Sequence, residues 1–301
     1  MSSDAPDGNL IDPDAFKRAS ALGMLARKIV EGYKVGEHRS PLKGFAIEFA
    51  QHREYSPGDD TRHLDWKMFG RSEKLFIKQY EQDTNFTATV MLDCSRSMNF
   101  GSGEVTKFNY AKLVAAALSH AVLLQRDAVS LGFLAGGQPN LIPRVDTPGR
   151  MPHLMNLLAD AEATGDADLG ADLAKVSPAI KPRSIVVILS DLLGDEQSFI
   201  RAIQRFQHTK TEVIVFHVLD HAELTLPYKD KVRFEGLEGE MPIITHPEEF
   251  AEAYREEVEA FCKRLRIACE SHDAHYVLAD TSKSVGELIG GYLIFRQRTH
   301  R

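Results

Sequence analysis

Two aspartates and two serines occupy positions from which their oxygen atoms could converge on one metal ion. Asp93, Ser95 and Ser97 follow directly after the apolar run 86–92, and Asp191 follows a second apolar run, 185–190. Apolar runs of this length predict strands that are buried on both faces, as in a parallel sheet. The carboxyl ends of such strands meet at the edge where open α/β folds bind ligands, so we expect the four side chains to lie close together.

Carboxylate and hydroxyl oxygens are the ligands that hard cations prefer. Mg²⁺, or Mn²⁺ in its place, takes about six oxygen ligands and retains several waters, which suits a site with few direct protein ligands. The hydroxyls of Ser95 and Ser97 can both face the ion, while Asp93 and Asp191 supply charge through water. A coordination position left open could accept an acidic side chain of a partner. The alternative is that Asp93 and Ser95 only cap the following helix or close a turn.

The elements that would position these residues alternate between strand and helix patterns, which predicts a doubly wound, mostly parallel α/β sheet. A capping box at Thr245 and Glu248 predicts the start of a further helix after residue 245. Strands are expected at 86–92, 128–134, 141–145, 185–189, 212–219 and 275–278. The other helices of this part are expected at 106–125, 151–163, 169–176, 197–206 and 285–295.

The chain ahead of the α/β part has a different pattern. An amphipathic helix is expected at 16–33, followed by two partly alternating strands at 44–55 and 74–80. We therefore divide the chain into a disordered tail (1–13), a smaller N-terminal element (14–85) and an α/β domain (86–301).

Composition excludes several classes of function. The net charge of −7 over 301 residues argues against nucleic acid as a partner, because phosphate binding needs a basic face. No apolar stretch approaches the ~18 residues of a membrane span, and the polar N-terminus does not resemble a signal peptide. Three cysteines cannot form a paired framework, so we expect a reducing cytoplasm, with Cys262 and Cys269 in the core and Cys94 beneath the metal loop.

The chain also resembles a known family over almost all of its length beyond the first forty or so residues. The motifs are Arg53-Glu54-Tyr55-Ser56-Pro57-Gly58-Asp59-Asp60, Arg62-His63-Leu64-Asp65-Trp66, Lys78-Gln79-Tyr80-Glu81, Asp93-Cys94-Ser95-Arg96-Ser97-Met98, Ser190-Asp191, Asp220-His221-Ala222-Glu223 and Tyr292-Leu293-Ile294-Phe295-Arg296. They are similar to those of the bacterial family called domain of unknown function fifty-eight, which is built on a von Willebrand factor A-type domain.

The resemblance implies that Asp93, Ser95, Ser97 and Asp191 form a metal-ion-dependent adhesion site. Members of the family are often encoded beside MoxR-type AAA+ ATPases, which implies an adaptor or co-chaperone-like partner of such an ATPase or of its client protein. A-type domains usually add a threonine ligand in a G-x-T-x-L context. Here Ala167 stands at that position and cannot ligate. Asp168 or Asp166 is a candidate substitute and Thr164 lies nearby, although none of the three is in register.

A turn-rich segment of mixed charge is a second candidate binding surface. It is either an ion-paired loop that fixes two strands to the A-type body, or a docking surface for the partner. Its candidate residues are Arg53, Asp59, Asp60, Arg62, Asp65 and Trp66.

These observations together favour a non-enzymatic, metal-dependent protein-binding module. Two alternatives stay open. One is a magnesium-dependent hydrolase that uses the same ion to activate water. The other is a scaffold whose metal site has degenerated, which the alanine at position 167 would explain.

Overall fold

Six strands form the central sheet, in the spatial order β10-β7-β6-β3-β4-β5. The structure is a computed structural model, and it describes residues 13–34, 47–54, 70, 75–82, 87–166, 168–237 and 241–299. Neighbouring strands are parallel except for β4 and β5, which confirms the predicted mostly parallel α/β fold. The strands are β3 (Thr87–Asp93), β4 (Ala128–Leu134), β5 (Asn140–Leu141), β6 (Ile185–Ser190), β7 (Glu212–Leu219) and β10 (Ala274–Asp280).

The strand order places a topological switch point between β3 and β6. From β3 the chain continues outward through β4 and β5 on one side, and it then returns to add β6, β7 and β10 on the other side. Loops that leave β3 and β6 therefore separate at the carboxyl edge, and ligands bind in the crevice between such loops. Asp93 ends β3, and Asp191 directly follows β6. The fold thus brings the two predicted carboxylates to this crevice.

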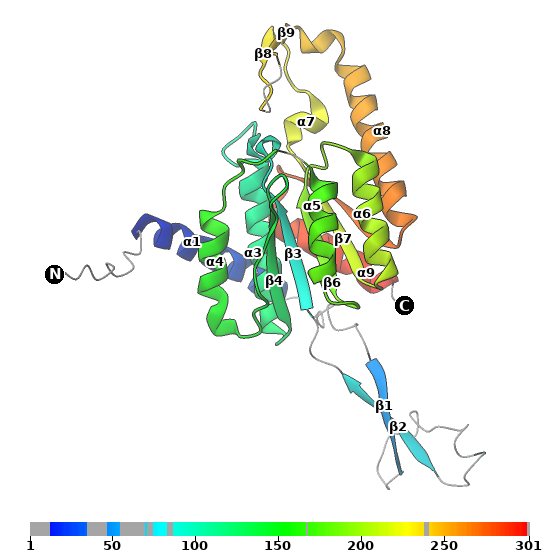
Figure 1. Ribbon diagram of the computed structural model, residues 1–301. Helices are drawn as coiled ribbons and strands as arrows, with labels where there is room; N and C mark the ends of the chain where they lie inside the picture. Colours follow the sequence, from blue (N-terminus) through cyan, green and yellow to red (C-terminus); the bar gives the residue numbers. More distant parts are fainter. Residues whose placement is uncertain are drawn as a thin grey trace, which may run out of the picture. The chain divides into compact units, whose positions relative to one another are not determined.

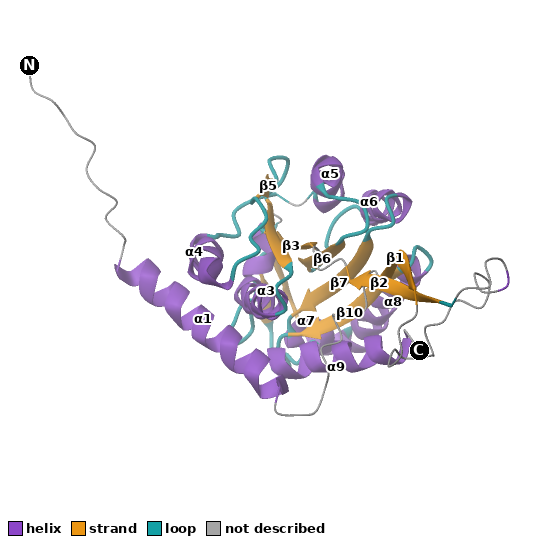
Figure 2. Ribbon diagram, turned by 90° about the horizontal axis from the view of Figure 1, so that it is seen from below, coloured by secondary structure: helices purple, strands orange, loops and turns teal. Residues whose placement is uncertain are grey.

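Helices cover both faces of the sheet (Figures 1 and 2). On one face lie α1, α3, α4 and α9, and on the other lie α5, α6 and α8. The first group is α1 (Pro13–Lys34), α3 (Lys107–Leu124), α4 (Met151–Asp160) and α9 (Val285–Thr299). The second group is α5 (Leu169–Val176), α6 (Glu196–His208) and α8 (Ala251–Glu270).

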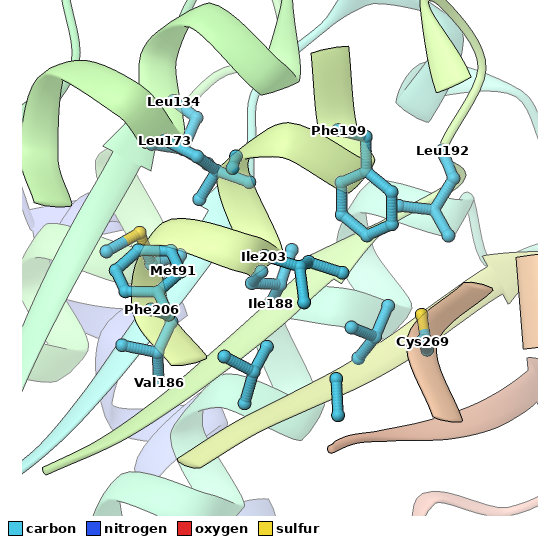
Figure 3. Close-up of a cluster of buried hydrophobic side chains, with 14 of the residues drawn as sticks. Met91, Leu134, Leu173, Val186, Ile188, Leu192, Phe199, Ile203, Phe206 and Cys269 are labelled. Atoms are coloured by element: carbon cyan, nitrogen blue, oxygen red, sulfur yellow. The ribbon is translucent and has the colours of Figure 1, made fainter. Parts of the chain in front are cut away.

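The core on the second face shows why these helices pack as they do. Asp195 caps α6 by accepting a hydrogen bond from the backbone N–H of Gln197. Phe199, Ile203 and Phe206 then recur at helical spacing on one side of α6, and all three are buried against the apolar side chains of the sheet (Figure 3). This stripe anchors the layer that follows Asp191 along the chain.

Several short elements differ from the sequence-based expectations. Helix α7 (His221–Thr225) and the hairpin of β8 (Val232–Phe234) and β9 (Ile243–Thr245) were not expected. The predicted capping box at Thr245 and Glu248 is wrong, because Thr245 ends β9 and α8 begins only at Ala251, with no side-chain cap at Phe250. The strand expected at 141–145 is shorter, and Val145 contributes only an isolated bridge to Val129.

The N-terminal helix groups differently from the predicted division. Residues 1–38 and 87–301 form one unit, and residues 39–86 form a second unit. Helix α1 therefore belongs with the α/β body, and not with the element predicted at 14–85. The physical reason is its packing against α3 and α4. Its residues Ala19 and Ala26 are buried there, at 3% and 0% exposure. The tail expected at 1–13 lies outside the described residues except for Pro13, which begins α1.

The second unit contains an antiparallel pair, β1 (Ile47–Glu54) and β2 (Phe76–Gln82), with a register irregularity between Phe49 and Gln51. Arg53 lies in β1, opposite Ile77. The other residues of the predicted docking surface, Asp59, Asp60, Arg62, Asp65 and Trp66, lie outside the described residues.

All three cysteines are free and buried, as the sequence predicts. Burial, together with the nearby carboxylate of Asp93, raises the pKa of the Cys94 thiol to about 12. A thiol with such a pKa stays protonated and is a poor nucleophile. Cys94 is therefore a packing residue beneath the loop that follows β3. Among the described helices, none is both long and apolar enough to cross a membrane.

Candidate functional site

The structure brings Asp93, Ser95 and Ser97 together directly after β3. The backbone N–H of Ser95 donates to Asp93 Oδ1 at 2.8 Å, which closes a tight turn. The hydroxyl oxygens of Ser95 and Ser97 lie 3.0 Å apart. Ser95 precedes the short 3₁₀ helix η2 (Arg96–Asn99), but its hydroxyl makes no cap hydrogen bond to that helix. Asp93 therefore closes a turn, and the hydroxyl groups of Ser95 and Ser97 face each other.

Asp93 is tied to the neighbouring strand. Ser190, the last residue of β6, donates its hydroxyl to Asp93 Oδ2 at 2.5 Å. Asp93 and Ser190 are both buried. Burial and the charge of Asp191 raise the pKa of Asp93 to about 6, although the hydrogen bonds from Ser190 and Ser95 oppose this shift. A cation bound nearby would stabilise the ionised form of Asp93 and so lower its pKa.

Asp191 is fully buried and faces a cation from its own chain. Its Oδ1 accepts from the backbone N–H of Leu193 at 3.2 Å, and its Oδ2 accepts from Lys107 Nζ at 2.8 Å. Lys107 Nζ also donates to Glu223 Oε1 at 2.7 Å. Burial alone would lower the pKa of Lys107, but Asp191 and Glu223 outweigh it and raise the pKa above its ordinary value. Lys107 is therefore charged.

A second loop, between α4 and α5, supports the segment that carries the hydroxyl pair. The backbone N–H of Gly165 donates to Cys94 O at 2.9 Å, and the N–H of Arg96 donates to Gly165 O at 3.0 Å. An ion pair between Arg96 Nη2 and Asp166 Oδ1, at 2.7 Å, joins the same two loops at the surface. Ala167, which stands at the threonine position expected from the A-type resemblance, directly follows Asp166 in the chain.

Of the residues at and next to the threonine position, the structure describes Asp168, whereas Ala167 lies outside the described residues. Asp168 is exposed and caps α5, with its Oδ1 accepting from the backbone N–H of Ala171 at 3.0 Å. A role of Asp168 as a metal ligand stays a prediction.

The donor set of this site fits a hard divalent cation. The two hydroxyl oxygens lie within contact distance of each other, Asp93 bonds to Ser95, and Asp191 lies close enough to Asp93 to raise its pKa. These are the oxygen ligands that Mg²⁺ and Mn²⁺ prefer. Among the described residues, no group of three or more His, Cys, Asp or Glu side chains is placed to hold a metal.

An open cleft of about 440 Å³ adjoins the hydroxyl pair; we call it the Ser97 cleft. Its polar residues are Ser97, Lys107, Glu223 and Glu235. The hairpin of β8 and β9, which stands beyond the end of the sheet where α7 lies (Figure 1), contributes to its walls. Several wall side chains are apolar and exposed. Leu193, Leu237, Met241 and Ile243 are 44%, 45%, 88% and 63% exposed.

The two candidate bases near the site are both engaged in hydrogen bonds. His217 Nε2 donates to the carbonyl oxygen of Asp191 at 2.8 Å, and its Nδ1 accepts from the Tyr276 hydroxyl at 2.6 Å. Burial lowers the pKa of His217 to about 4, so the ring is neutral. Glu223 binds Lys107 through Oε1, and its Oε2 accepts from the backbone N–H of Asp220 at 2.8 Å.

Lys107, Ser190 and Glu223 were not predicted as site residues. A signal for Lys107 existed, because it lies four residues before Ala111 and seven before Val114, which are both buried on α3. A charged residue in the buried stripe of a helix requires a partner. Glu223 stands three residues after Asp220, which is the spacing of the capping box that the structure shows there.

The mostly parallel, doubly wound sheet is the fold of a von Willebrand factor A-like protein. The chain belongs to the family described as "Protein of unknown function DUF58", whose model matches residues 51–264. The uncharacterized proteins Rv1480 of Mycobacterium tuberculosis and Mb1516 of Mycobacterium bovis are each 27% identical to it over 225 residues, which is 73% of this chain and 70% of the relative.

Solved structures with a similar arrangement include the conserved hypothetical protein BatB from Bacteroides thetaiotaomicron. The identity is 16%, the match covers 71% of this chain and 100% of that one, and the TM-score is 0.48. The VWA domain of SpRpn10 is 15% identical over 69% of this chain and 95% of its own, with a TM-score of 0.41. At these identities the likeness extends to the fold alone.

Proposed function

We propose that this protein is a non-enzymatic, metal-dependent protein-binding module that acts as an adaptor or partner of a MoxR-type AAA+ ATPase or of its client. The observation that carries this proposal is the hydroxyl pair of Ser95 and Ser97, 3.0 Å apart at the switch point of the sheet, with Ser97 lining an open cleft. Asp93 and Asp191 stand beside the pair and add negative charge.

Each residue has a distinct role in this proposal. Ser95 and Ser97 would hold Mg²⁺ or Mn²⁺ directly, while Asp93 and Asp191 would contribute charge through water. When bound, the ion would supply a positive centre that attracts a carboxylate of the partner. Ser95 is 1% exposed and Ser97 9% exposed, and Ser97 is the one that lines the cleft. A partner would therefore approach from the side of the cleft.

The apolar walls of the Ser97 cleft support a protein as the ligand. When a partner covers exposed apolar side chains such as Met241 and Ile243, the complex is stabilised by roughly 25 cal/mol per Å² of apolar surface removed from water. Apolar surface beside a polar anchor is typical of the central part of protein interfaces. We infer that the partner covers these side chains when its carboxylate reaches the ion.

The hydrogen bonding of the nearby bases supports binding over hydrolysis. A hydrolase would need a base that can accept a proton from water, with a pKa near the working pH. Asp93 has such a pKa, about 6, but both of its carboxyl oxygens already accept hydrogen bonds, from Ser95 and Ser190. Both ring nitrogens of His217 and both carboxyl oxygens of Glu223 also have partners. The family resemblance supports the MoxR-type ATPase as the partner.

A pair of matched surface substitutions tests where the partner binds. Ile243→Glu places a charge in the wall of the Ser97 cleft, whereas Ile267→Glu changes a residue of α8 that is similarly exposed, at 56% against 63%. Surface-plasmon resonance with the cognate MoxR-type ATPase should show at least tenfold weaker binding for Ile243→Glu alone. Equal binding by both variants and the wild type would place the interface elsewhere.

A further inference from the structure

Lys107 is an unusual residue for its position. It is the first residue of α3, its side chain is 0% exposed, and its ammonium group contacts two carboxylates, Asp191 at 2.8 Å and Glu223 at 2.7 Å. The amino end of a helix carries partial positive charge, so a cation is disfavoured there and an anion is preferred. A buried lysine at this place is retained because of its partners.

The two carboxylates belong to separate loops at the carboxyl edge. Asp191 directly follows β6, and Glu223 lies on α7, after β7. Glu223 also closes the capping box of α7 with Asp220, whose carboxyl group accepts hydrogen bonds from Ser102. The ammonium group of Lys107 therefore joins the loop after β6 to α7, and Asp220 joins the start of α7 to Ser102.

The charges at this edge explain what the ammonium group does. Asp93, Asp191 and Glu223 are three carboxyl groups, and close carboxylates repel one another when no cation lies between them. A lysine on α3 supplies one positive charge without any bound metal. The same ammonium group donates a hydrogen bond to Asp191 Oδ2 and repels other cations. It therefore also opposes the binding of a divalent ion.

We propose that Lys107 is a built-in counter-ion that holds the site together in the metal-free protein and weakens its affinity for the divalent cation. This inference rests on the function proposed above, because it concerns the same site. A partner carboxylate adds a ligand for the ion, and the coupling between the two ligands is reciprocal. Because the affinity for the divalent ion is lowered, the ion should occupy the site most fully when the partner is also bound.

The substitution Lys107→Met tests this directly, because methionine is similar in length and carries no charge. Magnesium titration by calorimetry should show at least tenfold tighter binding to Lys107→Met than to the wild type. In EDTA, the thermal unfolding midpoint of Lys107→Met should be lower than that of the wild type. Magnesium should raise the midpoint of the variant by more than it raises that of the wild type.

Lys112→Met is the matched control. Lys112 lies on the same helix, and its ammonium group donates to the backbone carbonyls of Ala159 and Ala161. This variant should lose stability equally with and without magnesium, and its magnesium affinity should equal that of the wild type. If Lys107→Met does not fold, the double variant Lys107→Met/Glu223→Gln replaces it, because it removes one charge of each sign. The double variant should also bind magnesium at least tenfold more tightly than the wild type.

The outcomes separate this inference from the function on which it rests. If the wild type binds magnesium and neither the folded single variant nor the double variant binds it more tightly, the counter-ion role is overturned and the metal-dependent module stands. Binding by a Lys107 variant but not by the wild type supports the counter-ion role and contradicts metal dependence in the native protein. If neither the wild type nor any variant binds magnesium, both are overturned.

Discussion

The carboxyl group of Asp191 lies 2.8 Å from the ammonium group of Lys107, and both side chains are completely buried. Breaking a buried ion pair by removing one partner is strongly destabilising, by about 3–5 kcal/mol, because the other charge stays buried without compensation. In this protein the pair stands beside the hydroxyls of a candidate cation site. Its integrity therefore affects both the stability of the sheet edge and the charge available to a metal.

The first prediction concerns the hydroxyl pair. Ser95→Ala and Ser97→Ala should each lower magnesium affinity at least tenfold, which corresponds to about 1.4 kcal/mol, because each removes a direct oxygen ligand. Calorimetric titration measures this. Ser119→Ala is the control, since the Ser119 hydroxyl is buried on α3 without a hydrogen-bond partner among the described residues and lies outside the site. Affinity unchanged in both site variants would remove the serines from the coordination sphere.

The second prediction concerns pH. Burial lowers the pKa of His217 from 6.5 to about 4, so the unfolded state binds more protons between these values. The stability that the neutral ring contributes is therefore complete above pH 6.5 and is lost as the pH falls toward 4. The free energy of unfolding of the wild type relative to His217→Gln should decrease by up to about 3 kcal/mol over this window. Urea unfolding at several pH values measures it.

Asp93 acts in the opposite direction over a similar window. Its pKa is raised from 3.8 to about 6, so its ionised form costs stability above pH 6 and protonation relieves this cost as the pH falls. The comparison of the wild type with His217→Gln keeps Asp93 constant and so isolates the histidine. A difference in unfolding free energy that does not change with pH would contradict the assignment of a neutral, buried ring.

The third prediction concerns the loop that supports Ser95. Gly136 adopts a positive φ of 57°, and a Cβ atom there would collide with the backbone of Asp166, next to the Gly165 bridge. Gly136→Ala should therefore destabilise the protein by about 1–3 kcal/mol and weaken magnesium binding, because the supporting loop must move. Gly149→Ala is the control, since nothing lies within 4 Å of its Cβ position. Unfolding curves of equal midpoint for the two variants would show that the loop adapts.

The fourth prediction concerns the core beneath the site. Phe206 of α6 is 1% exposed among the apolar residues of the sheet (Figure 3). Phe206→Ala should lower the free energy of unfolding by about 3–5 kcal/mol, because the lost side chain leaves a cavity in a close-packed layer. Denaturant unfolding measures this. Truncation of the exposed Leu124 should cost far less, and equal losses would contradict the packing described here.

The long buried strands could be predicted from the sequence. Strand β7 has the predicted bounds, and β3 and β6 are within one residue of them, because strands covered on both faces consist of continuous apolar runs. The hairpin of β8 and β9 could not be predicted this way. Its strands have three residues each and only partly buried or exposed side chains, so no alternation marks them.

For the site, the strand-end positions of Asp93 and Asp191 were sufficient to predict that they would meet. The ion-pair network around Asp191 was harder to find, because Lys107 and Glu223, which bond to each other, lie 84 and 32 residues from Asp191 in the chain. The sequence contains no periodic pattern that links a helix start after β3 to a short helix after β7. Only the three-dimensional order of the strands brings Asp191 and Glu223 to the same ammonium group, that of Lys107.

The most direct test of metal-dependent partner binding compares the wild type with the double variant Ser95→Ala/Ser97→Ala. Magnesium is kept constant, because AAA+ ATPases themselves bind magnesium with nucleotide and chelator would affect both proteins. Surface-plasmon resonance with the cognate MoxR-type ATPase should show at least tenfold weaker binding to the double variant, while its thermal unfolding in EDTA matches that of the wild type. Undiminished binding of the ATPase by the folded double variant would contradict a metal-dependent interface.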